Sequence, residues 1–276
     1  MFENVSEGWR IGKAVRKLVF SDRGLLLYPI VAGITVVIEA IVIFLALLLP
    51  TGFSMAAGVV AVFATYIVTT FTATYILIAM LLGFRSFTKG KRISMGEAFA
   101  QAAEYRTVAL EWSIFYSIVI MAARIIESRV RGIPGIILGA TLGVAISFAT
   151  LFSIPVMVDE KAGPITIMKA SAQFCVKNFG KSAGGLLYTD LYNMMFIILG
   201  GLLLFGSFFA GLSGAAILAA LAVGCVLIVL GVVMNSVMSN VFRFVLYEYM
   251  NGKGLPEGIS EELIKGSIRA SQGKQG

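Results

Sequence analysis

Histidine is absent from the 276-residue sequence, which has only two cysteines, Cys175 and Cys225. Histidine is the commonest metal ligand and a frequent general base, and it is the usual axial ligand of haem. Cys175 falls in a predicted cytoplasmic segment, whereas Cys225 falls inside an apolar run, and the two form no CxxC pair. We therefore expect no disulfide, no metal site and no cofactor.

Charged residues are also scarce, at 13% of the chain, while 58% of the residues are hydrophobic. An ordinary soluble domain has about 25% charged residues, so this composition could not cover a water-exposed surface. Catalytic clusters of carboxylates or nucleophiles are missing, and so is a Walker sequence for ATP. The sequence therefore predicts an all-α integral membrane protein that is not an enzyme.

Six apolar runs are long enough to cross a bilayer as helices, which requires about 20 mostly apolar residues. The runs extend over about 25–49, 55–84, 108–126, 136–158, 186–209 and 215–249. Because no long polar gap separates them, residues 1–250 are expected to form a single transmembrane domain. The remaining residues, 251–276, are expected to form a polar cytoplasmic tail.

The basic residues orient the predicted helices. The chain has a net charge of +7, and its lysines and arginines gather before the first run, after the second and fourth runs, and at the C-terminus. Only Arg124, Arg129 and Arg131 fall near a predicted outer loop. Cytoplasmic loops of membrane proteins are enriched in such cations, so we expect a multi-pass protein of the cell membrane with both termini in the cytoplasm. Because no basic domain stands apart from the membrane, we expect no nucleic-acid partner.

A short amphipathic segment precedes each of three helical hairpins, at about 7–20, 94–105 and 164–179. The first segment places Trp9, Val15, Leu18 and Val19 opposite Arg10, Lys13, Arg16 and Lys17. The second begins with a capping box, Ser94 with Glu97, and the third begins at Pro164, a favoured first-turn residue. Helices with one basic and one apolar face lie flat among anionic headgroups, so we expect these segments to be interfacial and membrane lipids to be partners.

The recurrence of this unit predicts three parallel hairpin pseudo-repeats, each consisting of a cytoplasmic interfacial helix and two transmembrane helices. All three copies have the same membrane orientation, so a symmetry axis would lie along the membrane normal. A chance arrangement of six helices into three hairpins is the alternative.

Ionisable residues inside apolar runs are costly and usually face a bundle interior or a watery cavity. Glu39 lies about 14 residues, or roughly 21 Å, from the inner end of its run. Arg124 lies at a similar height on the third run, so the two side chains can pair. A second candidate group lies in the inner half and comprises Glu111, Asp190, Asn193, Asn240 and Arg243.

Two interpretations of these residues remain open. They can form a polar path for an ion or a headgroup, or they can be structural pairs that fix helix register and side chains that reach the interface. Thr65, Thr69 and Thr72 form a stripe on the second run, and Gly139 and Gly143 form a GxxxG motif on the fourth. We interpret both patterns as helix-packing devices.

Three stretches give the chain a family resemblance. They are GWRIGKAVRKLVFSDRGLLLYPIVAGI, SIPVMVDEKAGPITIMKASAQFCVKNFGKSAGG and FRFVLYEYMNGKGLPEGISEELI. Together they resemble a prokaryotic family of six-helix integral membrane proteins of unknown function. This resemblance implies an architecture and no activity, so it assigns no functional residues.

Two functions fit the sequence. The first is a transport-related role, as a small-solute or lipid permease or as the membrane subunit of a transporter. The second is a non-transporting scaffold or accessory subunit that associates with other membrane subunits. The ionisable residues inside the apolar runs favour the first, and the interfacial segments favour the second.

Overall fold

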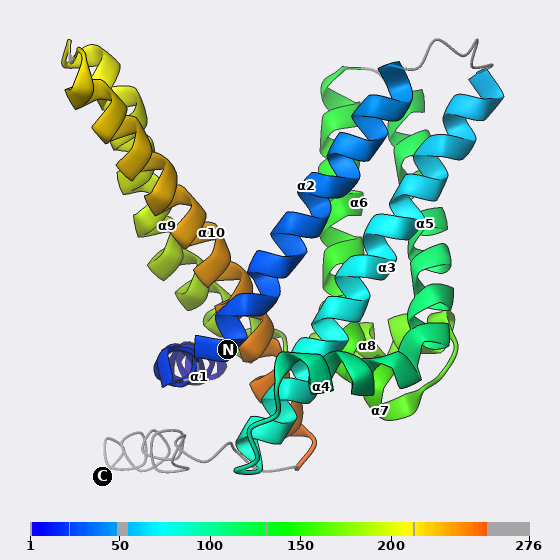
Figure 1. Ribbon diagram of the computed structural model, residues 1–276. Coiled ribbons are helices and arrows are strands. Elements are labelled where there is room, and N and C mark those ends of the chain that lie inside the picture. The colour runs from blue at the N-terminus through cyan, green and yellow to red at the C-terminus, as the bar shows by residue number, and fades with distance from the viewer. Residues whose placement is uncertain (1, 22, 49–54, 131, 212, 253–276) are drawn as a thin grey trace. The chain divides into compact units, whose positions relative to one another are not determined.

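The structure is a computed structural model that describes residues 2–21, 23–48, 55–130, 132–211 and 213–252 (Figure 1). The chain forms two compact units, a terminal unit of Met1–Pro29 and Phe179–Gly276 and a central unit of Ile30–Asn178. The single transmembrane domain expected from the sequence stays a prediction. Most of the predicted polar tail, residues 253–276, lies outside the described residues.

Five helices in the described part of the chain are long and apolar enough to cross a membrane. They are Val60–Thr88, Met95–Arg129, Ile133–Glu160, Phe179–Phe209 and Ala215–Met250. A bent pair, Asn4–Phe20 with Gly24–Glu39, passes the same test and raises the number to six if it forms one span. Regular structure in the described residues is entirely helical. The helices indicate a multi-pass membrane protein, as the composition predicts.

The terminal unit contains α1 (Phe2–Ser21), η1 (Arg23–Leu26), the start of α2 (Leu27–Leu48), α9 (Phe179–Phe209) and α10 (Ala215–Met250). α9 and α10 run side by side as a hairpin (Figure 1), and α1 packs against both. The predicted sixth run, 215–249, matches α10. α9 begins earlier than the predicted start at residue 186, because the polar and glycine-rich residues before that position are helical rather than part of a loop.

Glycines bring the backbones of α9 and α10 into contact. A Cβ atom on Gly200 would lie 2.7 Å from the carbonyl oxygen of Gly224, and one on Gly224 would lie 2.9 Å from that of Gly200. Two turns further along α10, a Cβ on Gly231 would lie 2.8 Å from Cγ1 of Ile197. Side chains at these positions would force the helices apart, so the hairpin depends on their absence.

Glycines also bring the backbones of α1 and α9 into contact. A Cβ atom on Gly8 would collide with the carbonyl oxygen of Lys181, and one on Gly184 would collide with that of Val5. One turn after Gly8, a Cβ on Gly12 would lie 2.9 Å from the ring of Tyr188. The two backbones therefore touch along two turns of α1.

The central unit contains the rest of α2 and six further helices. They are α3 (Met55–Thr88), α4 (Met95–Ala102) with η2 (Ala103–Tyr105), α5 (Arg106–Arg129), α6 (Ile133–Ala149), α7 (Ser153–Glu160) and α8 (Pro164–Lys177). α3 packs against α4, α5 and α7, while α8 packs against α5, α6 and α7. An ion pair of 2.8 Å between Arg85 Nη2 and Asp159 Oδ1 joins α3 to α7.

The predicted fourth run, 136–158, lies within the candidate span Ile133–Glu160, which has a break where α6 ends at Ala149 and α7 begins at Ser153. Pro155 explains the break, since proline has no N–H for the carbonyl four residues earlier and its ring clashes with that carbonyl. A side chain of another helix satisfies one backbone group at this break. The Phe152 N–H donates to Ser171 Oγ of α8 at 3.0 Å.

The second and third short helices begin as predicted, whereas α1 begins earlier, at Phe2, and has a different environment. Ser94 and Glu97 form both hydrogen bonds of the capping box, and α8 begins at Pro164. The apolar face of α1, however, is covered by protein, since Val15 and Val19 are fully buried and α1 packs against α9 and α10. An apolar face covered in this way does not insert into lipid.

Gly184→Ala should separate α1 from α9, because its Cβ would collide with the backbone of Val5. Overpacking of this kind costs about 1–3 kcal/mol, so we expect thermal unfolding of the purified protein in detergent to occur several degrees lower. Gly201→Ala is the matched control on the same helix, since nothing lies within 4 Å of its Cβ position. That control should unfold at the wild-type temperature or slightly above it. Equal unfolding temperatures for the two variants would contradict the backbone contact.

Candidate functional site

Glu39 of α2 is an acidic side chain inside an apolar helix of the central unit. Its carboxylate is half-buried, and Oε2 accepts a hydrogen bond of 2.7 Å from Thr69 Oγ1 of α3. None of the ion pairs found among the described residues includes Glu39. An apolar helix therefore presents a carboxylate whose observed partner is a neutral hydroxyl.

Other hydroxyls lie one turn away on the same two helices. Thr35 precedes Glu39 by four residues on α2, and Thr65 precedes Thr69 by four residues on α3, so each pair shares one helical face. Thr35 Oγ1 donates to the carbonyl of Ala32 at 2.8 Å, and Thr65 Oγ1 donates to that of Ala61 at 2.9 Å. Each hydroxyl oxygen keeps acceptor capacity while its proton is engaged. Oxygen acceptors of this kind suit a proton or a hard cation.

The structure gives each member of the predicted Glu39–Arg124 pair a different partner. Arg124 Nη1 lies 2.9 Å from Glu127 Oε2, one turn further along α5. Arg124 pairs with Glu127 rather than Glu39 because a partner on the same helix does not require two helices to come together. Gly139 of α6 leaves room for the Glu127 carboxylate, because a Cβ there would collide with it. Gly143, the other glycine of the predicted packing motif, has nothing within 4 Å of its Cβ position.

Asp190 and Asn193 of α9 have opposite environments, although their spacing of three residues places them on neighbouring positions of the helix surface. Asp190 is exposed, whereas Asn193 is fully buried. Asn193 Nδ2 donates to the carbonyl of Thr189 at 2.7 Å and to Oδ1 of Asn235 on α10 at 3.3 Å. The boundary of the α9–α10 contact therefore passes between Asp190 and Asn193, and Asn193 links the two helices of the hairpin.

The remaining members of the predicted inner cluster are dispersed. Asn240 is buried on α10 and donates to the carbonyl of Ser236 at 2.8 Å, and Arg243 is half-buried one turn further along the same helix. Glu111 belongs to the central unit, where it is exposed on α5. The described residues contain no group of three or more His, Cys, Asp or Glu side chains placed to hold a metal ion.

Two groups of contacts in the terminal unit were not predicted from the sequence. Lys181 Nζ lies 2.9 Å from Glu7 Oε1 of α1 and donates to the sulfur of Met250 on α10 at 3.6 Å, so one side chain joins three helices. Along α9, the rings of Tyr188 and Tyr192 stack with centroids 6.4 Å apart. The four-residue spacing of these tyrosines is the sequence signal that identifies the stack.

Thr69→Val should alter the environment of the Glu39 carboxyl, because valine has the shape of threonine without the hydroxyl donor. We expect the infrared difference spectrum between wild-type protein and Glu39→Gln to show the Glu39 carboxyl band, and this band to be shifted in Thr69→Val. Thr65→Val is the matched control, because its hydroxyl donates within its own helix. A Thr69→Val band that coincides with the wild-type band would exclude the hydrogen bond.

Comparison with known proteins identifies a family and no characterised relative. No curated protein and no solved structure matches the chain. The model of a family described as a family of unknown function, DUF6159, matches residues 56–255. The matched region includes Thr69 and the whole α9–α10 hairpin, and Glu39 precedes it. The match extends over well over half of the sequence, and the chain belongs to the DUF6159 family.

Proposed function

We propose that the protein is transport-related, either a permease for a small solute or lipid or the membrane subunit of a transporter, and that Glu39 binds the coupling ion. The supporting observation is the Glu39 carboxylate on an apolar helix with the Thr69 hydroxyl as its partner. In this proposal the protein moves an ion or a solute and catalyses no covalent reaction.

The energies favour ion binding at Glu39 over a purely structural role. A charged side chain within the hydrocarbon costs about 3 kcal/mol on insertion scales. Interhelical hydrogen bonds in membranes contribute about 0.6 kcal/mol on average, so the Thr69 bond offsets a small part of that cost. A proton or a bound cation neutralises the carboxylate and removes most of the remainder. A carboxyl group that must take up a cation to stay in lipid is suited to couple ion movement to transport.

The proposal includes the architecture expected from the sequence. Six transmembrane helices would form three parallel pseudo-repeats, with α1 before α2 and α3, α4 before α5 and α6, and α8 before α9 and α10. Both termini would lie in the cytoplasm and the protein in the cell membrane, as the distribution of lysine and arginine indicates. In each of these three units the first helix is shorter than the two helices assigned to the hairpin, which supports this arrangement.

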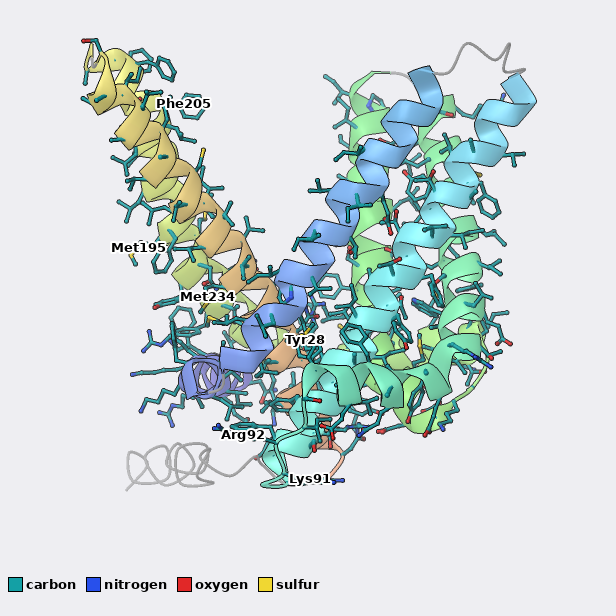
Figure 2. All side chains as sticks on the ribbon, in the orientation of Figure 1. Tyr28, Lys91, Arg92, Met195, Phe205 and Met234 are labelled. Carbon is teal, nitrogen blue, oxygen red and sulfur yellow. The ribbon has the colours of Figure 1, made fainter. Side chains whose placement is uncertain are left out.

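A scaffold or accessory subunit is the second candidate, and the α9–α10 hairpin favours it. In the most apolar window of α10, 11% of the residues are buried inside the protein. Large apolar side chains such as Met195 and Phe205 project from the hairpin (Figure 2), and Phe205 is 70% exposed. This surface is available to lipid or to other membrane subunits.

The test is ion flux in reconstituted liposomes. Vesicles loaded with a pH-sensitive dye are energised with a potassium diffusion potential, and pooled amino acids, carboxylates, amines and sugars are supplied outside. A parallel set measures sodium with a sodium-sensitive dye. We expect wild-type flux of protons or sodium to exceed that of empty liposomes at least tenfold with one pool, and Glu39→Gln to reduce it to the empty-liposome rate.

Glu160→Gln is the matched control. Glu160 is an exposed carboxylate at the end of α7 in the same unit, so this variant loses the same charge from the last residue of a candidate span rather than from inside one. We expect it to keep wild-type flux. Wild-type flux in Glu39→Gln would contradict the role of Glu39. The absence of flux from wild-type protein with every pool would contradict the transport proposal and favour the scaffold.

A further inference from the structure

Three cations form one exposed stripe along α1. Arg10, Lys13 and Lys17 are spaced three and four residues apart, which places them on a single face of the helix. All three are exposed, whereas Ile11 and Val15 on the opposite side are fully buried. The stripe therefore presents three positive charges within about 11 Å along the helix axis.

Contacts with α9 fix which face of α1 is exposed. The backbone of α1 touches that of α9 at Gly8 and Gly12, and rotation of α1 would replace these glycines with side chains that do not fit. The ion pair between Glu7 and Lys181 holds the same side of α1 against α9. It also neutralises an acidic group that would otherwise weaken the positive field of the stripe.

The position of α1 along α9 places the stripe at the membrane surface. α9 has 31 residues and is roughly 46 Å long, whereas the hydrocarbon core is about 30 Å thick. α1 crosses the first turns of α9, from Lys181 to Tyr192. The Trp9 ring lies edge-on to Tyr188, with centroids 4.9 Å apart. Tryptophan and tyrosine gather at the level of the headgroups, so these aromatics mark the interface.

Aromatic side chains also flank the stripe itself. Trp9 is 40% exposed and Phe20 is 54% exposed, one near each end of the three cations. The fourth cation of the helix, Arg16, has a different role, because its guanidinium lies 4.9 Å from the centroid of the Tyr192 ring. The exposed surface thus combines cations that form none of the ion pairs found among the described residues with side chains that prefer the water–lipid boundary.

We propose that Arg10, Lys13 and Lys17 bind the phosphate headgroups of anionic phospholipids in the bilayer that holds the protein, with Trp9 and Phe20 beside them. Binding is electrostatic and does not require the apolar face of α1 to enter the lipid. The proposal is independent of the transport function, because it involves no residue of the Glu39 site.

The experiment is a lipid titration of full-length protein in detergent, followed by native mass spectrometry. We expect phosphatidylglycerol to bind wild-type protein more tightly than phosphatidylcholine, and the affinity to fall as ammonium acetate is raised. The triple variant R10Q/K13Q/K17Q should bind phosphatidylglycerol roughly a hundredfold more weakly, since each cation near an anionic surface contributes about fivefold. Its phosphatidylcholine binding should be unchanged.

Two variants serve as controls. K89Q/K91Q/R92Q loses the same charge from exposed sites outside all three amphipathic segments and should keep wild-type affinity for phosphatidylglycerol. R10K/K13R/K17R keeps the charge and should also bind normally. Thermal unfolding in lipid-free detergent should be the same for all variants, because the buried face of α1 is untouched.

Three outcomes would overturn the proposal. Wild-type affinity in the triple α1 variant would show that the stripe is not the binding surface. An equal loss in K89Q/K91Q/R92Q would show a dependence on net charge alone. Displacement of the lipid by millimolar inorganic phosphate would show that the stripe binds a soluble anion rather than a lipid.

Discussion

In lipid, two helices gain little by covering apolar side chains, because the surrounding acyl chains solvate those side chains equally well. The terminal unit therefore depends on backbone contact at glycine. Gly200 and Gly224 let α10 approach α9, and Gly8 and Gly184 let α1 approach it from another side. Contact between the backbones then fixes the positions of the side chains around each glycine. Lys181 then contacts Glu7 of α1 and Met250 of α10, although both residues are far from it in the sequence.

The central unit also has polar contacts between helices. Tyr75 donates to the carbonyl of Phe99 at 2.9 Å, and Arg85 pairs with Asp159. These contacts match a donor with an acceptor or a cation with an anion, so they leave no charge for a ligand to neutralise. Glu39 differs, because its carboxylate is matched with a neutral hydroxyl. That difference in charge balance, rather than burial alone, distinguishes a candidate ion site from a structural contact.

Hydropathy predicted the apolar cores of the helices and little of how they meet. The limits of α10 agree with the expected run within one residue, because a long apolar stretch satisfies its backbone hydrogen bonds in a bilayer by forming a helix. The helix α9 begins before the predicted apolar run, since Ser182, Gly184 and Gly185 have the composition of a loop and are helical where α1 contacts them. Glu39 was recognisable as a lone charge, but its partner Thr69 was not, because pairing depends on the rotation of two helices about their axes.

The amphipathic pattern of α1 is equally compatible with insertion into lipid and with docking on protein, and its glycines distinguish the two. Each glycine in a helix interior costs about 1 kcal/mol relative to alanine, so Gly8 and Gly12 together cost about 2 kcal/mol. Contact with lipid does not offset this free-energy cost, because acyl chains fit around an alanine methyl group as easily as around a glycine. Backbone contact with α9 requires the missing side chains. Glycine on the apolar face of an amphipathic helix therefore indicates a protein partner for that face.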